Sequence, residues 1–271
     1  MIPRRLPAFG LALLASAALA LAGCSKPTGT TGGSAGASTG SGAVPAATTQ
    51  PAGDDKARVL AAIAGLKQTS YRYTVAAHGL SGGGMADPVG KKATLSLKGT
   101  RGSLPVTIDL VVVSPLTWVK MIFGTENDSL GIPTRYMRVD VTKLTKGGLA
   151  IDPDASDPGR VQELLKIVGD VQRVEGGTYK ITLDISGVSA AVLDPDTVKK
   201  LGPKAKAVPA TVTLDNQGRL VAATVSLAAL IPDEPDMTAA YSDFGTPVTV
   251  AAPAASDTVD APQKLYDFLN Q

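Results

Sequence analysis

Apolar and polar residues alternate with a period of two from residue 71 to 243, and this pattern most restricts the folds open to the chain. In the clearest run, 178–186, every second residue is apolar: Tyr179, Ile181, Leu183 and Ile185. Successive side chains of a strand point to opposite faces of its sheet, so each such run predicts a strand with one apolar face. Further strands are predicted at 71–80, 93–99, 105–113, 116–123, 135–140, 171–175, 207–214, 219–227 and 237–243. The sequence Asp-Asn-Gln-Gly at 215–218 predicts a hairpin between two of them.

Helical segments are few, and each has a recognisable start. Apolar residues at three- and four-residue spacing in 57–66 follow acidic capping candidates at 54–55 and predict an opening helix. Asp-Pro pairs at 157–158 and 194–195 predict two more helices, and a last helix follows the Ala-Pro pair at 261–262. These elements predict an α+β fold, in which helices cover the apolar face of one large antiparallel sheet. A strongly twisted sheet of this kind would curve into a half-barrel.

The N-terminus predicts a lipoprotein signal peptide spanning residues 1–23. Arg4 and Arg5 precede an apolar stretch at 6–21, and Ala22-Gly23 supplies small residues before Cys24. A basic start, an apolar middle and a small-residue cut site are the parts of a secretory signal. The apolar stretch has about 16 residues, fewer than the roughly 20 that a membrane span needs. We therefore expect acylation of the Cys24 sulfur and anchoring of the mature chain at the extracytoplasmic face of the cell membrane.

Two different regions are predicted after the cleavage site. Residues 24–53 are almost wholly Ser, Gly, Thr, Ala and Pro, and such a composition buries too little apolar surface to offset its ordering entropy. We expect a flexible tether that holds the following domain on the order of 30 Å from the bilayer. Residues 54–271 are expected to form one domain, because no second linker interrupts them.

Charge and cysteine content exclude several functions. Removal of residues 1–23 takes away two arginines, so the 26 basic side chains fall to 24 and equal the 24 acidic ones. A neutral chain without a basic run offers no phosphate-neutralising surface, so we expect no nucleic-acid partner. With Cys24 acylated, no thiol remains for a disulfide, a metal or a nucleophile. We expect no cofactor.

Catalysis receives little support from the sequence. A Ser-His-Asp arrangement would have to use His78, the only histidine, and no nucleophile-elbow motif accompanies it. We interpret His78 as a surface residue near a turn and expect that the protein is not an enzyme. The glycine run at 82–84 lacks the Lys-Ser/Thr of a phosphate loop and is interpreted as a flexible hairpin connection.

A calcium loop is a weak alternative in the segment before the second predicted helix. Four residues match its ligand positions 1, 3, 5 and 12: Asp152, Asp154, Ser156 and Glu163. Asp157 stands where the loop needs glycine, and this residue is better explained as a helix cap. We expect no metal site.

Several segments together resemble the actinobacterial LppX/LprG-type lipoproteins. They are the signal sequence with its tether, Tyr-Arg-Tyr-Thr at 71–74, the paired Asp-Pro helices and the closing segment Tyr-Ser-Asp-Phe-Gly-x-Pro at 241–247. In layout the resemblance covers nearly the whole chain. It implies a LolA-like fold, in which helices cross the concave side of a curved antiparallel sheet above a hydrophobic cavity. It also implies that the protein binds, and carries, a lipid or lipoglycan in the cell envelope.

A cavity for an acyl chain needs aliphatic walls. Each buried CH₂ of the ligand contributes ~0.8 kcal/mol, and an unpaired polar group in the wall would offset several of them. The candidate wall residues are Val106, Ile108, Leu110, Val112, Val161, Leu164, Leu165, Ile181, Leu183 and Ile185. Alternating aliphatic residues also serve to pack any sheet on helices. The alternative is therefore a structural or partner-binding envelope lipoprotein with a filled core and no ligand.

Overall fold

The computed structural model describes residues 52–144, 155, 161–188, 195–232 and 234–270. Within these residues twelve strands form one sheet with the order β12-β6-β5-β4-β3-β2-β1-β11-β10-β9-β8-β7. The strands are β1 (Tyr71–Ala77), β2 (Leu80–Asp87), β3 (Lys92–Arg101), β4 (Leu104–Val113), β5 (Leu116–Phe123), β6 (Tyr136–Val139), β7 (Val168–Arg173), β8 (Thr178–Leu183), β9 (Val208–Leu214), β10 (Leu220–Val225), β11 (Met237–Ser242) and β12 (Thr258–Asp260).

The sheet consists of two antiparallel meanders joined at one seam. Strands β1 to β6 follow one another across half of the sheet, and β7 to β11 cross the other half. The seam is the antiparallel pair of β1 and β11, in which Tyr73 lies opposite Tyr241. Only β12 is parallel to its neighbour, β6. The sheet stays open, with β7 and β12 at its edges. The predicted α+β class with one large, mostly antiparallel sheet is confirmed.

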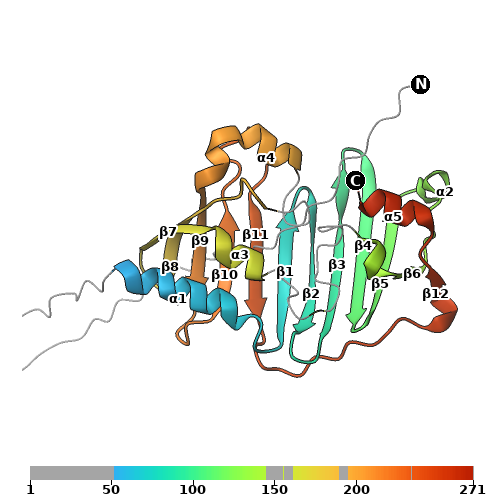
Figure 1. Ribbon diagram of the computed structural model, residues 1–271, viewed down its shortest axis with the longest axis horizontal. Helices are drawn as coiled ribbons and strands as arrows, with labels where there is room; N and C mark the ends of the chain where they lie inside the picture. The colour runs from blue at the N-terminus through green and yellow to red at the C-terminus, as the bar shows by residue number, and fades with distance from the viewer. Residues whose placement is uncertain (1–51, 145–154, 156–160, 189–194, 233, 271) are drawn as a thin grey trace, which may run out of the picture.

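Helices α1 (Ala52–Gly65), α3 (Val161–Ile167) and α5 (Gln263–Leu269) lie on one face of the sheet, here called the inner face (Figure 1). The α-helices are α1 (Ala52–Gly65), α2 (Asn127–Leu130), α3 (Val161–Ile167), α4 (Pro195–Leu201) and α5 (Gln263–Leu269), and the 3₁₀ helices are η1 (Val141–Lys143), η2 (Gly202–Ala207) and η3 (Ala255–Asp257). Helix α1 packs on β7, β9, β10 and α3. Helix α5 packs on β5, where the rings of Phe268 and Phe123 meet at 5.4 Å. One apolar core connects the buried side chains of both helices with those of the inner face.

The ten predicted strands are confirmed, with bounds that differ by up to three residues. The predicted opening helix and the helices at 195–201 and after 262 are confirmed too. The helix predicted from 157–158 appears as α3 from Val161, and residues 156–160 lie outside the described residues. The predicted hairpin at 215–218 is present, closed by hydrogen bonds from the Gly218 N–H to the Asp215 carbonyl and from the Asp215 N–H to the Arg219 carbonyl.

One strand contradicts the sequence interpretation. The run 82–84, expected to be a flexible hairpin connection, lies inside β2 and pairs with β1 and β3 along its length. Glycine is needed there because the neighbouring backbone is close: a Cβ on Gly84 would lie 1.9 Å from the Thr94 carbonyl oxygen. Three glycines in a row hide the period of two, so this strand has no alternating signal. The short strand β12 was also not predicted.

Candidate ligand-binding face

Seven of the ten predicted cavity-wall residues lie on the inner face of the sheet, in two separate places. Val106, Ile108, Leu110 and Val112 belong to β4, and Ile181 and Leu183 belong to β8 with Ile185 just beyond it. All seven are buried in the main core, and Leu165 of α3 packs against that core half-buried. For Val161 and Leu164 only the backbone is described.

The sheet order separates these two groups. Six strands lie between β4 and β8, and seven spacings of about 4.8 Å give about 34 Å along the sheet. The ten residues therefore do not line one wall side by side. Sequence periodicity identified the correct face of each strand, but the order of strands is set by long-range pairing that periodicity does not contain.

The middle of the inner face carries aromatic side chains that the sequence analysis did not select. Tyr71 is the centre of this aromatic group: its ring lies 6.0 Å from that of Tyr73, 5.7 Å from that of Tyr241 and 6.2 Å from that of Phe244. The three tyrosines are buried. The available signal was the Tyr-x-Tyr spacing at 71–73, which places both rings on one face of a strand.

The tyrosine hydroxyls sit in an apolar setting. The Tyr73 hydroxyl donates a hydrogen bond to the Thr94 carbonyl at 2.6 Å. Because Tyr73 pairs with Gly84, its ring passes over a strand position without a side chain. Burial raises the pKa of both Tyr73 and Tyr241, so both remain protonated near neutral pH.

The described helices cover only the two ends of the inner face. Helices α1 and α3 lie over the β7 to β11 half, and α5 lies over the other half near β5 (Figure 1). None of the helices drawn in Figure 1 lies over the inner face of β1 to β3. The inner-face side chains of these strands are aliphatic or aromatic and buried: Tyr73, Val75, Leu95 and Leu97.

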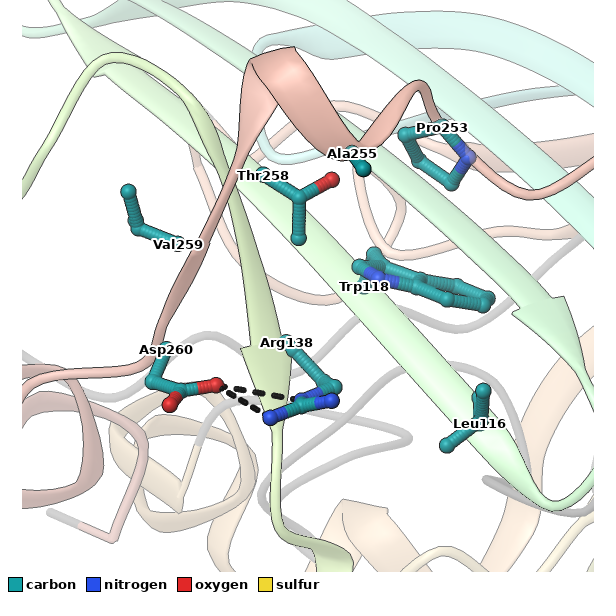
Figure 2. A pocket seen from close by; sticks show the side chains of 8 residues that line it. All are labelled: Leu116, Trp118, Arg138, Pro253, Ala255, Thr258, Val259 and Asp260. Carbon is teal, nitrogen blue, oxygen red and sulfur yellow. Dashed lines mark hydrogen bonds and ion pairs between the residues drawn. The ribbon is translucent and has the colours of Figure 1, made fainter.

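Two pockets bounded by described residues lie on the opposite, outer face. Figure 2 shows the first, of about 490 Å³, whose floor holds Trp118 and whose rim holds Leu116 and Pro253. The Arg138 guanidinium donates two hydrogen bonds to one carboxylate oxygen of Asp260, at 3.1 and 2.7 Å, on the solvent side of this pocket. The second, of about 510 Å³, lies over β1, β2 and β11 and is lined by Arg72, Tyr73, Thr74, Gly83, Gly84, Met85, Ala240 and Ser242. Neither pocket is lined by a predicted wall residue.

His78 differs from the expected surface residue. It lies in the turn between β1 and β2 with φ 51°, and its side chain is only 20% exposed. Its Nδ1 lies 2.9 Å from Oε1 of Glu234, whose other oxygen lies 3.8 Å from the Lys200 ammonium of α4. The His78 Nε2 is buried without a hydrogen-bond partner. This arrangement joins α4 to the end of the sheet, and no hydroxyl of a described residue hydrogen-bonds to Nε2 for activation as a nucleophile.

The predicted acylation site and most of the calcium-loop candidates cannot be placed in the fold. Cys24 and the calcium-loop candidates Asp152, Asp154 and Ser156 lie outside the described residues, as does Asp157, while Glu163 lies in α3. Among the described side chains, no three of the types His, Cys, Asp or Glu gather closely enough to hold a metal ion. In the same part of the chain, no helix is long and apolar enough to cross a membrane.

Comparison with protein-family models and with curated proteins gives no match for this chain.

Proposed function

We propose that this protein is a membrane-anchored, extracytoplasmic lipoprotein of LolA-like architecture that binds the acyl part of a lipid or lipoglycan on the inner face of its sheet. The observation that carries the proposal is that the described helices cover the two ends of this face but not its middle. Helices pack on its two ends, and between them the inner-face side chains of β1 to β3 are apolar members of the buried core with no described helix above them.

An acyl chain would lie across β1 to β3, between α3 and α5. The side chains there offer aliphatic and aromatic contacts, and the Tyr73 hydroxyl already donates to a carbonyl. Such a surface contributes ~0.8 kcal/mol for each CH₂ that it removes from water. The polar head group would stay at the rim of the sheet.

Membrane attachment rests on Cys24 in this proposal. We expect Cys24→Ala to release the protein into the soluble fraction, because the acyl chains on the sulfur are the anchor. Cell fractionation with a carbonate wash measures this. Recovery of the variant in the washed membrane pellet would contradict the anchor.

Ligand binding is tested on a soluble chain of residues 25–271, which keeps every described element because these begin at Ala52. Native mass spectrometry is expected to show copurified lipid, and a fluorescent palmitate is expected to bind. Leu97→Gln, on the inner face of β3, should weaken palmitate binding about tenfold, since a buried amide costs more than 1.4 kcal/mol. The matched control is Lys98→Gln, whose side chain lies on the other face of the same strand. No lipid and no uptake would favour the alternative, a partner-binding lipoprotein with a filled core.

The proposed role is noncatalytic. The contact between His78 and Glu234 supports this, because the remaining imidazole nitrogen is buried and meets no hydroxyl. Hydrolysis of a p-nitrophenyl ester that disappears in His78→Ala would contradict it.

A further inference from the structure

The large apolar side chains that are exposed in the described part of the chain lie in turns or directly beside them. They are Val89, 73% exposed, Leu116, 44% exposed, and Val174, 50% exposed. Val89 lies in the turn between β2 and β3, Leu116 follows the turn between β4 and β5, and Val174 begins the turn between β7 and β8. Single exposed apolar residues are common, so their relative position decides whether they matter.

Strand register places all three turns at the same end of the sheet, here called the hairpin end. Lys92 at the start of β3 pairs with Val113 at the end of β4, so the first two turns are neighbours. The Ser114 N–H donates to the Lys91 carbonyl at 3.1 Å and joins them directly. The strands from β2 through β1, β11, β10, β9 and β8 to β7 are paired antiparallel, each with the next. Their registers place the turn between β7 and β8, which holds Val174, at this end as well.

Each exposed apolar residue has a basic neighbour. Lys91 follows Val89 closely and is exposed, and Arg173 directly precedes Val174. Leu116 shares its pocket with Arg138, as Figure 2 shows. Long basic side chains can lay their aliphatic part on an apolar surface while the charge reaches a polar or anionic layer. Apolar tips with adjacent basic groups are typical of segments that rest in the interface of a membrane.

Most acidic groups of the hairpin end are engaged within the protein. The Asp87 carboxylate accepts a hydrogen bond from the Gly90 N–H at 2.8 Å. Asp215 pairs with Arg219 at 2.6 Å, and Asp243 lies 3.5 Å from Arg72. Glu175, beside Val174, is the exposed acidic residue for which no such contact is assigned. Near Val89, the exposed Lys91 has no ion pair assigned among the described residues, whereas Arg138 near Leu116 is paired with Asp260.

We propose that the hairpin end contacts the surface of an anionic bilayer, with Val89 and Leu116 inserted among the head groups. The proposal rests on the membrane anchor of the proposed function, because a predicted tether on the order of 30 Å keeps the domain beside the bilayer. Helix α1 has 14 residues, about 21 Å, and leads through Gly65 to the start of β1 at this same end. The tether is thus long enough for the hairpin end to reach the membrane.

The test uses the soluble chain of residues 25–271, which lacks the acylated cysteine, and vesicles of phosphatidylglycerol and phosphatidylcholine. Wild type is expected to sediment with these vesicles. Val89→Asp combined with Leu116→Asp should lower the bound fraction at least tenfold. Ser103→Asp, an exposed position in the turn at the opposite end of the sheet, is the control and should bind as wild type does. Absence of wild-type binding, or equal binding of the double variant, would overturn the proposal.

A second variant separates charge from insertion and does not disturb any core side chain. Lys91→Glu should weaken binding to the anionic vesicles about fivefold, and equal wild-type binding to pure phosphatidylcholine vesicles would overturn the role of charge. Palmitate uptake by the double variant should equal that of wild type, since Val89 lies in a turn beyond the ends of β2 and β3 and Leu116 lies beside the outer pocket, so neither side chain is on the inner face. Loss of vesicle binding with intact palmitate uptake therefore distinguishes this proposal from the failure of ligand binding.

Discussion

Gly84 occupies a position where any side chain would meet backbone. Its Cβ would lie 1.9 Å from the Thr94 carbonyl oxygen, which also accepts the Tyr73 hydroxyl. We expect Gly84→Ala to lower the free energy of unfolding by about 3 kcal/mol or more, because strands β2 and β3 must separate locally. Gly65→Ala is the control, since a Cβ there has no neighbour within 4 Å. Urea unfolding measures the stability of both variants. Equal urea midpoints for Gly84→Ala and Gly65→Ala would show that the fold does not need the close approach of Gly84 to β3.

Asn127 is a buried amide whose three hydrogen bonds all go to backbone. It accepts from the Phe123 N–H at 2.7 Å and donates to the carbonyls of Met121 and Ile132 at 2.8 and 3.1 Å. Asn127→Ala leaves these groups unpaired, and we expect a loss of about 2–4 kcal/mol in unfolding free energy. Ser129→Ala in the same short helix is exposed and should cost less than ~1 kcal/mol. Similar losses for the two variants would contradict this account.

Asp215 gives the β9–β10 hairpin a dependence on pH. Partial burial would raise the pKa of its carboxyl, but hydrogen bonds from Arg219 and from the Gln217 N–H outweigh burial and lower the pKa. Because the pKa is lowered in the folded state, the ionised carboxylate stabilises the fold at pH values above its unfolded pKa. This contribution to the free energy of unfolding is lost as the pH falls through the folded pKa. Wild type should therefore lose more stability than Asp215→Asn between about pH 7 and about pH 3. Urea midpoints at the two pH values test this, and parallel losses would contradict it.

At the scale of elements, the segment 244–254 after β11 crosses to the outer face and covers the only tryptophan. Val250 packs there with Val111 and Trp118 and is itself buried. We expect Val250→Asp to lift this segment, shifting Trp118 emission to longer wavelength and increasing its quenching by acrylamide several-fold. The exposed neighbour Thr249→Asp should leave the emission unchanged. An unchanged spectrum for Val250→Asp would show that the segment does not shield the indole.

The sequence predicted those elements that have a local signal. Strand β8 shows a strict alternation, and helix α4 begins at the proline that the Asp-Pro pair predicted. Strand β2 lacked such a signal because glycines replace the alternating residues. The candidate site was predicted less well, since its geometry depends on contacts between distant residues. His78 and Glu234 are 156 residues apart, and no local pattern links them.

At the scale of the whole molecule, the pairing of β1 with β11 decides where the proposed ligand would lie. It joins the two meanders and places Tyr73 and Tyr241 opposite each other at the centre of the inner face. The predicted wall residues of β4 and β8 then stand on either side of this centre rather than around one pocket. A ligand site at this centre would need residues from both meanders, because neither β1 to β6 nor β7 to β11 forms it alone.

The most direct test of lipid binding is photocrosslinking with a diazirine-bearing palmitate, followed by peptide mapping. The account predicts that label attaches to inner-face positions of β1, β3 and β11, such as Val75, Leu97 and Tyr241, and that excess unlabelled palmitate removes it. Label confined to the outer pocket around Trp118, or no label that palmitate displaces, would contradict it.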